Sequence, residues 1–361
     1  MQPFLYFSTG FIVMVTALEW FQPAIFRPTN LFGVTVAPNA ARQPEGQAII
    51  RRWHVGVVLI GLVGVGLTLI PLPLDRVELL LVRSGVMLLV VLGQVVRYIM
   101  AHHQAQALAV PEASGVHEAS LAVRPRQTLI PWWWELLPLG LIGATAFILA
   151  QQYASAPAII PIHWNLNDQV DRTTAKTIGS FFLMVWIQLG LFVLLTSITA
   201  TVGVTRIGNN ASPGSQQYRM AMARFLFFAK SMIILLLGTM GLLLANSSVT
   251  NTAPKTVTLF ASLGVVVVIL AVGAFVFFRY GQSGWRIDAR VGTVSPADNM
   301  PDSAWKGGII YYNPRDPALF VERRSGMGFT LNFGHRGSWF FMGGLVLFVV
   351  VLSVGLPLIL K

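Results

Sequence analysis

The sequence predicts an all-α polytopic membrane protein, with about eight transmembrane helices and a small β-rich insert. Two observations support this class. Hydrophobic residues make up 55% of the 361 residues and charged residues only 11%, whereas a soluble domain carries about 25% charged residues. The apolar residues also form runs long enough to cross a bilayer, which takes about 20 residues in a helix. This apolar excess is expected where lipid surrounds the chain.

The predicted spans are the long apolar runs, taken in order. They cover residues 3–21, 54–74, 77–99, 132–150, 177–202, 225–246, 256–278 and 339–360. Several runs have no amphipathic period, as expected for helices that contact lipid on most sides. The first run lacks a preceding basic region, so we interpret it as a retained helix and not as a cleaved signal peptide. Gly61, Gly64 and Gly66 have the spacing of a close helix contact in the second span.

Basic residues alternate between the loops. Nineteen of the 25 Lys and Arg residues follow the first, third, fifth and seventh spans or lie at the adjoining helix ends, and five lie on the opposite side. Because basic loops stay in the cytoplasm, we predict that both termini are extracytoplasmic. The net charge of +11 then indicates contact with anionic headgroups of the lipid bilayer, and we expect no nucleic acid partner.

The alternation divides the chain into four regions. Residues 1–131 hold three helices and a cytoplasmic connector, in which His102 and His103 are expected to be solvated. Residues 132–278 hold four helices and an outer loop over 151–176. Residues 279–338 form a cytoplasmic basic module, and residues 339–361 form the final helix. The turn residues and short aromatic pieces of the module predict small strands.

The outer loop contains the richest cluster of polar residues. An imidazole, amides and carboxylates lie close together in it, and a turn near Asn167 would gather them. The candidate ligand-binding residues are His163, Trp164, Asn165, Asp168, Asp171 and Lys176. Three interpretations stay open: an ordered interfacial loop, a binding surface, and a metal or catalytic site. The spacing matches neither a calcium loop nor a zincin His pair, and we predict no metal and no cofactor.

This same string resembles a known family. Pro161, His163, Trp164, Asn165, Asp171 and Lys176 fit the pattern of the domain of unknown function 1648, which is found in SdpI-like immunity and signalling proteins of bacteria. Where the family usually has glycine, this chain has Asp168. The segments 305–321 and 328–333 are similar to a second uncharacterised domain, number 5808. The resemblance implies a bacterial inner (plasma) membrane protein and no known reaction.

The module and the spans add further candidates. For the module we keep three interpretations open: contact with lipid or a protein partner, a structural role, and nucleic acid binding. The candidate contact residues are Trp305, Tyr311, Tyr312, Arg323 and Arg324. Within the spans, Glu19, Glu135 and Lys230 lie near cytoplasmic helix ends, where we expect their charged groups to reach the interface.

The preferred hypothesis is sensing or immunity-type binding of an extracytoplasmic ligand, a peptide or an envelope component, through loop 151–176. A cytoplasmic or membrane protein partner would receive the signal. Two alternatives stay open: a transporter or permease subunit, and an accessory subunit of a membrane complex. We expect no catalytic residues and no enzyme activity. The chain has no cysteine, which excludes thiolate chemistry and disulfides.

Overall fold

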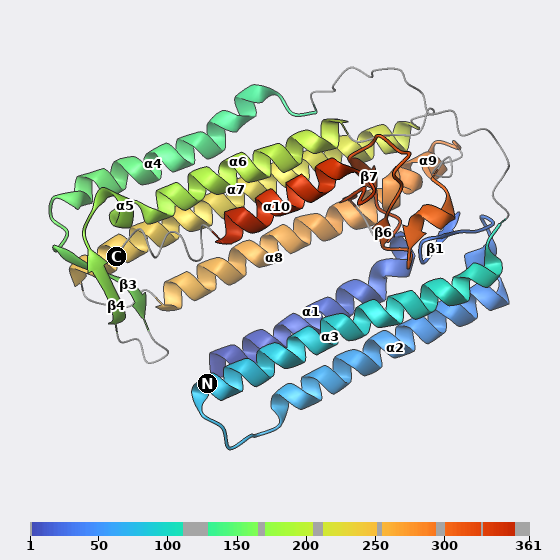
Figure 1. Cartoon of the computed structure of the whole chain (residues 1–361), viewed down its shortest axis with the longest axis horizontal. Coiled ribbons are helices and arrows are strands. Elements are labelled where there is room, and N and C mark those ends of the chain that lie inside the picture. The colour runs from blue at the N-terminus through green and yellow to red at the C-terminus, as the bar shows by residue number, and fades with distance from the viewer. Residues whose placement is uncertain are drawn as a thin grey trace. The chain divides into compact units, whose positions relative to one another are not determined.

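The protein is an all-α polytopic chain with small separate strand pairs, as predicted (Figure 1). The structure, a computed structural model, describes residues 2–110, 129–164, 170–204, 212–250, 255–293, 300–325 and 328–350. Seven helices in these ranges are long and apolar enough to cross a membrane. The eighth predicted span begins in a described helix, but residues 351–361 lie outside the described residues.

The helices follow the predicted order with shifted ends. They are α1 (Gln2–Ile25), α2 (Pro44–Leu69), α3 (Arg76–Ala105), α4 (Leu136–Tyr153), α5 (Ile178–Phe181), α6 (Leu183–Val204), α7 (Pro213–Thr250), α8 (Lys255–Tyr280), α9 (Trp285–Arg290) and α10 (Arg336–Val350), with 3₁₀ turns η1 (Ala40–Arg42), η2 (Gln106–Leu108), η3 (Trp132–Glu135), η4 (Gln282–Gly284) and η5 (Asp302–Ala304). The strands are β1 (Asn30–Leu31), β2 (Val34–Thr35), β3 (Ile159–Trp164), β4 (Val170–Ala175), β5 (Trp305–Lys306), β6 (Ile310–Tyr311), β7 (Phe320–Glu322) and β8 (Phe329–Leu331).

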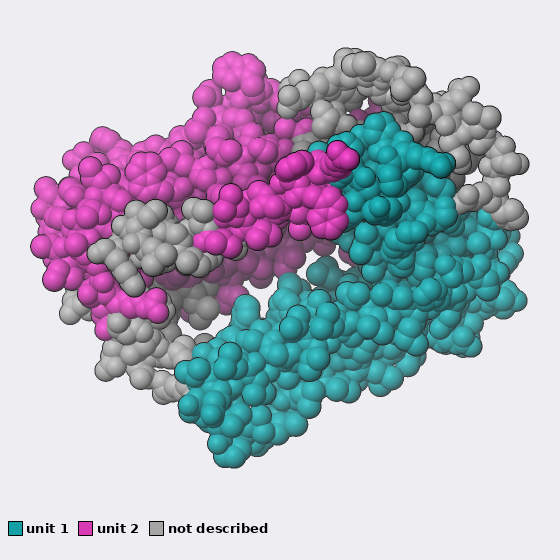
Figure 2. Space-filling view, viewed as in Figure 1, with its two compact units in different colours: residues 1–121, 206–214, 280–335 teal, residues 122–205, 215–279, 336–361 magenta. Residues whose placement is uncertain are grey.

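The chain forms two compact units, which Figure 2 distinguishes by colour. Unit 1 comprises residues 1–121, 206–214 and 280–335, and unit 2 comprises residues 122–205, 215–279 and 336–361. The segments that follow the first, third, fifth and seventh candidate spans therefore contribute to the same unit. This grouping agrees with the alternation of basic loops in the sequence.

In unit 1, helices α1, α2 and α3 pack side by side (Figure 1). Glycines of α2 permit the close approach. A Cβ on Gly61 would lie 2.4 Å from Thr16 Oγ1, and one on Gly64 would lie 2.3 Å from Val90 Cγ2. The predicted packing role is confirmed for these two glycines, whereas Gly66 faces open space.

The loop after α1 and the module of residues 280–335 form one packed body within unit 1. Strands β1 and β2 make a short hairpin, and its turn residue Gly33 packs against Gly308 of the module. A Cβ on Gly33 would lie 2.8 Å from Gly308 Cα, and both glycines have positive φ. The residue at each position must therefore be small and tolerate left-handed backbone.

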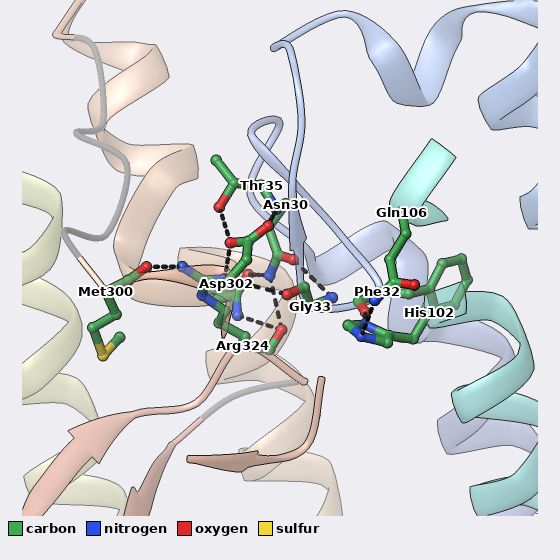
Figure 3. Close-up of polar contacts among 10 residues, drawn as sticks. Asn30, Phe32, Gly33, Thr35, His102, Gln106, Met300, Asp302 and Arg324 are labelled. Carbon is green, nitrogen blue, oxygen red and sulfur yellow. Dashed lines mark hydrogen bonds and ion pairs between the residues drawn. The ribbon is translucent and has the colours of Figure 1, made fainter. Parts of the chain in front are cut away.

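An ion pair supports this contact (Figure 3). Arg324 is paired with Asp302, which also accepts hydrogen bonds from Thr35 Oγ1 (2.7 Å) and Thr35 N (3.1 Å). Asn30 Nδ2 donates to the Arg324 carbonyl oxygen at 2.8 Å. Burial by itself would raise the pKa of Asp302, but Arg324 and the bonds from Thr35 outweigh it and hold the pKa below its usual value of 3.8.

The interpretation of His102 and His103 as solvated linker residues is wrong for His102. Helix α3 extends to Ala105, and His102 is buried with Nδ1 2.8 Å from the Phe32 carbonyl oxygen (Figure 3). The β1–β2 hairpin covers this imidazole, and no local pattern predicts that cover. Residues 111–128 of the predicted connector lie outside the described residues.

A carboxylate of the module also caps a membrane helix. The side chain of Asp288, in α9, accepts hydrogen bonds from Ser212 Oγ (2.6 Å) and from Gly214 N (2.8 Å) at the first turn of α7. The first amides of a helix have no partner within it, and a negative charge there also suits the helix dipole. Asp288 is fully buried, so this cap is part of the core of unit 1.

Unit 2 consists of α4–α8, α10 and the β3–β4 hairpin, apart from the helix ends that belong to unit 1. Its largest core cluster joins Ile142 and Leu149 of α4 to Phe181, Val185 and Ile234 of the neighbouring helices. The predicted fifth span begins with a short helix, α5, followed by α6. Figure 1 shows the hairpin beside the end of α4 and beside α5.

Candidate functional site: the hairpin after the fourth span

The candidate ligand-binding loop is built as an antiparallel hairpin. Strands β3 and β4 pair regularly from Ile159 opposite Ala175 to Pro161 opposite Thr173. Beyond Pro161 the register is irregular, which is the signature of a bulge. A bulge bends a strand and changes the direction of the side chains that follow it. The irregular part of the hairpin contains the candidate ligand-binding residues His163, Trp164 and Asp171.

The register brings part of the predicted cluster together. The backbone of His163 lies opposite Arg172, and that of Trp164 lies opposite Val170. Asp171 lies in β4 between these two pairs. The predicted proximity of positions 163, 164 and 171 is therefore a property of the strand pairing.

Lys176, the last predicted site residue, clamps the hairpin to α4. Its Nζ donates hydrogen bonds to the carbonyl oxygens of Tyr153 (3.0 Å) and Ala156 (2.6 Å), and lies 5.0 Å from the centre of the Tyr153 ring. The Tyr153 carbonyl ends α4 and the Ala156 carbonyl follows it, and a cation is favoured at this end of a helix. Asn165 and Asp168 lie outside the described residues.

The other side of the hairpin base is fixed to α5. Thr177 Oγ1 accepts a hydrogen bond from Ser180 N (3.1 Å), and Ser180 Oγ accepts one from Thr177 N (2.9 Å). The two bonds together form a capping box. Ser180 Oγ also lies 2.8 Å from the carbonyl oxygen of Ala175, the last residue of β4. The base of the hairpin is therefore held by α4 and α5 at once.

A small cavity of about 60 Å³ lies under β3. Strand β3 forms one wall and α5, α6 and α7 form the others. The lining side chains are apolar apart from the hydroxyl groups of Ser180 and Ser248. The residues that line it are Ile160, Pro161, Ile162, Ser180, Phe181, Leu183, Met184, Gly241, Leu244, Ala245 and Ser248. Its size suits a short aliphatic group and excludes a large solute.

Two family models match parts of the chain, and one of them covers this region. Residues 140–188 match a domain of unknown function, DUF1648, and residues 314–339 match a family of unknown function, DUF5808. The resemblance seen in the sequence to both domains is confirmed. The DUF1648 match covers most of α4, the whole hairpin, α5 and the start of α6. No curated protein and no solved structure matches the chain.

A second polar cluster, which the sequence did not predict, lies inside unit 2. Lys230 Nζ, in α7, donates to Glu135 Oε1 (2.7 Å) and Oε2 (2.5 Å) in η3 and to Thr196 Oγ1 (2.9 Å) in α6. The Lys230 side chain is 0% exposed and that of Glu135 is 22% exposed. The expectation that Lys230 reaches the interface is therefore wrong. Glu135 and Lys230 instead neutralise each other inside the bundle.

Aromatic rings complete the surroundings of Lys230. Its Nζ lies 5.2 Å from the ring centre of Phe192 and 5.5 Å from that of Phe227, and Trp134 packs against Phe227. Ring faces attract a cation, and the attraction is larger when the cation is desolvated. Glu135 and Lys230 are 95 positions apart in the chain, which explains why local spacing gave no signal for this pair.

The candidate residues of the module separate by exposure. Trp305, Tyr311 and Arg324 are buried, and their groups support the interior of unit 1: Tyr311 Oη donates to Asp316 Oδ2 at 2.9 Å, and the Trp305 and Tyr311 rings pack together. Tyr312 is 48% exposed and Arg323 is half-buried. Among the five candidates, only Tyr312 and part of Arg323 are therefore accessible to lipid or a partner.

Proposed function

We propose that the protein is a membrane receptor that binds an extracytoplasmic peptide or envelope ligand through the β3–β4 hairpin and reports it, as a sensing or immunity protein does. The single observation that supports the proposal is the construction of the hairpin. Its base is fixed by Lys176 and by the Thr177–Ser180 box, while Ile162, Arg172 and other residues above the base are exposed. A fixed base with an exposed end is what a preorganised binding loop requires.

The orientation belongs to the same proposal. Basic loops remain on the cytoplasmic side, and the segments that carry most of them gather in unit 1. The hairpin follows the fourth candidate span, so it would face outward. The chain lacks cysteine, and a single introduced cysteine is therefore a clean probe. We expect an impermeant maleimide to label Ile162→Cys in intact bacterial cells, and Tyr312→Cys only after lysis.

Binding is testable without knowing the natural ligand. The purified protein in lipid nanodiscs would be panned against a phage-displayed library of random linear peptides, and the enriched peptides would be synthesised and titrated. We expect them to bind the native chain and to lose binding to the triple variant His163→Ala, Trp164→Ala, Asn165→Ala. Ser155→Ala, exposed on the adjoining turn, is the matched control and should bind normally.

The result that would contradict the proposal is equally direct. Enriched peptides that bind the triple variant as well as the native chain would place recognition outside the hairpin. If the selection enriches no peptide although a cooperative thermal transition shows that the protein is folded, this surface has no peptide ligand. Labelling of position 162 only after lysis would remove the outward face altogether.

Transport is the second candidate function, and one observation favours it. Among the described residues, Gln94 in unit 1 and Gln188 in unit 2 are buried in candidate spans, and their Oε1 atoms accept no hydrogen bond. Unsatisfied polar atoms within lipid-spanning helices are costly and often mark a path. Each amide nitrogen, however, donates to the backbone of a neighbouring helix, which is a packing contact. Uptake of labelled amino acids or inorganic cations by proteoliposomes would favour transport over sensing.

We further propose that the module contacts a cytoplasmic protein or the inner leaflet through Tyr312 and its surroundings. Partly exposed aromatic and basic side chains suit both partners. Flotation with vesicles of anionic lipid is the simplest test, with the module kept within the full chain in nanodiscs of neutral lipid. Tyr312→Ser should weaken vesicle capture if lipid is the partner, and unchanged capture would remove Tyr312 from that role.

A further inference from the structure

The two edges of the β3–β4 sheet differ in what they present to a third strand. A hydrogen bond from Lys176 N to the Ala158 carbonyl oxygen (2.8 Å) marks residues 158 and 176 as a bonded pair. Bonded and non-bonded pairs alternate along an antiparallel ladder. Thr174 opposite Ile160 is therefore a bonded pair, whereas Thr173 opposite Pro161 is not.

In a non-bonded pair, the N–H and C=O groups point away from the partner strand. The outer edge of β3 therefore presents the backbone of Pro161, which has no N–H to donate. Proline is one of the means by which natural sheets close an edge to further strands. Strand β3 is thus a poor template for an added strand.

The outer edge of β4 has no such protection. It presents the N–H and C=O of Thr173 and the N–H of Ala175, while the Ala175 carbonyl already accepts from Ser180. Arg172, Thr173 and Ala175 are exposed. Within the described residues the sheet has two strands, so no third strand covers this edge.

We propose that the outer edge of β4 binds an extended peptide segment by strand addition, with Thr173 at the centre of the new ladder. This inference rests on the proposed function and names its ligand class and binding mode. Donors and acceptors that repeat at every second residue of a strand, roughly 7 Å apart, match an extended peptide backbone and no sugar or lipid chain. Strand addition is an established mode of peptide recognition, in which the main chain supplies affinity.

The side chains beside the edge narrow the ligand further. Arg172 is exposed next to Thr173, and opposite charges on neighbouring strands attract. We therefore expect bound peptides to carry an acidic residue close to the position that pairs with Thr173. The bulge beyond Pro161 limits the regular ladder to the base of the hairpin, so the bound segment is short.

The decisive variants are Thr173→Pro and Thr173→Val. Proline removes the N–H at the outer edge and crowds an added strand. It leaves the β3–β4 bonds in place, because residue 173 does not donate to β3. Valine keeps the backbone and the β propensity and removes only the hydroxyl group. We expect Thr173→Pro to weaken the library-selected peptides at least about tenfold, and Thr173→Val to change the affinity less than about twofold.

A test on the peptide itself does not depend on how a variant folds. The selected peptides would be synthesised with a single backbone N-methyl group at each position in turn and titrated against the native protein in nanodiscs. Strand addition predicts losses of at least about tenfold at alternate positions and small effects between them, because only every second N–H faces β4. An effect without this period of two would overturn the inference.

The remaining outcomes separate this inference from the proposed function. Peptides that lose binding to the His163, Trp164 and Asn165 triple variant but ignore Thr173→Pro and N-methylation would overturn strand addition and retain the hairpin as a receptor. Peptide binding would also be overturned if the selection yields no peptide and the native chain is a dimer in nanodiscs by particle mass while Thr173→Pro is a monomer. That result would assign the edge to a second copy of the chain. Binding lost on Thr173→Pro and retained on Thr173→Val, with the alternating methylation pattern, supports the inference.

Discussion

The Glu135–Lys230 pair gives the sharpest prediction about stability, because its geometry fixes the expected size of the effect. Lys230 has no exposed side-chain surface, and its three recorded hydrogen bonds go to Glu135 and Thr196. Replacing Glu135 by Gln leaves a buried ammonium group with neutral acceptors only. Replacing Lys230 by Met leaves a carboxylate that is partly exposed and therefore partly hydrated.

Breaking a buried ion pair from one side costs about 3–5 kcal/mol, whereas replacing both partners is much cheaper. The partial exposure of Glu135 places Lys230→Met at the low end of that range, about 3 kcal/mol. We expect Glu135→Gln to cost as much or more, since its charge is left in the drier position. The double variant should cost no more than either single variant. The coupling energy between the two residues is then at least about 3 kcal/mol.

The assay is the free energy of unfolding in mixed micelles, followed by tryptophan fluorescence during titration with a denaturing detergent. Thr196→Val removes the hydrogen bond from Lys230 (2.9 Å) and the long one to Glu135 (3.4 Å), and it should cost about 1 kcal/mol. Ser197→Ala, whose exposed hydroxyl bonds only to its own helix, is the matched control and should change stability by less than about 0.5 kcal/mol. Single-variant costs that simply add in the double variant would refute the paired geometry.

Three further predictions concern unit 1 and use the same unfolding assay. Folding lowers the pKa of Asp302, so the stabilisation by its carboxylate is complete above the usual pKa of 3.8 and is lost as the pH falls through the folded pKa. Asp302→Asn should therefore flatten the fall in the free energy of unfolding below pH 3.8. The same acid slope in the variant and the native chain would contradict this stabilising role of Asp302. Asp288→Ala should lower the free energy of unfolding by about 2 kcal/mol through loss of the cap on α7. Asp288→Asn should lower it by less, and equal losses for the two variants would show that charge rather than hydrogen bonding matters. Gly308→Ala should destabilise by more than about 1 kcal/mol, because its φ is +71° and its Cβ would meet buried atoms at 2.6 Å, whereas Gly66→Ala, in open space, should be neutral or slightly stabilising.

The sequence predicted seven of the spans and the small strands of the module, because both depend on local signals. It did not predict the β1–β2 and β3–β4 hairpins. A run of apolar residues needs no partner to be seen, and the glycine contacts of α2 follow from helix geometry. The alternation of basic loops likewise predicts that the segments after the first, third, fifth and seventh spans lie on the same side of the membrane. The end of α3 was less predictable. His102 is buried by the distant β1–β2 hairpin, and the residues next to His102 in the sequence do not indicate that contact.

Long-range pairs account for the rest. Thr35 and Asp302 are 267 residues apart, and Glu135 and Lys230 are 95 apart. Periodicity and composition carry no information about which distant residues meet, and one sequence without relatives offers no other signal. For the hairpin, the sequence located a polar segment between the fourth and fifth candidate spans. It could not show that Lys176 would bind the end of α4, because that role depends on where the strand returns.

These pairs give α4 a distinct place in unit 2. Its first turn follows Glu135, which is held by Lys230 of α7, and the carbonyls after its last turn are held by Lys176 of the hairpin. Between these points α4 packs mainly on α6, and Phe147 and Leu137 on its outer side are exposed. A helix fixed by charge at both ends and packed along one side moves as a unit, since bending it would break an ion pair or a cap. A displacement of the hairpin base would therefore reach the Glu135–Lys230 pair through α4, and the proposed receptor function requires such a mechanical link.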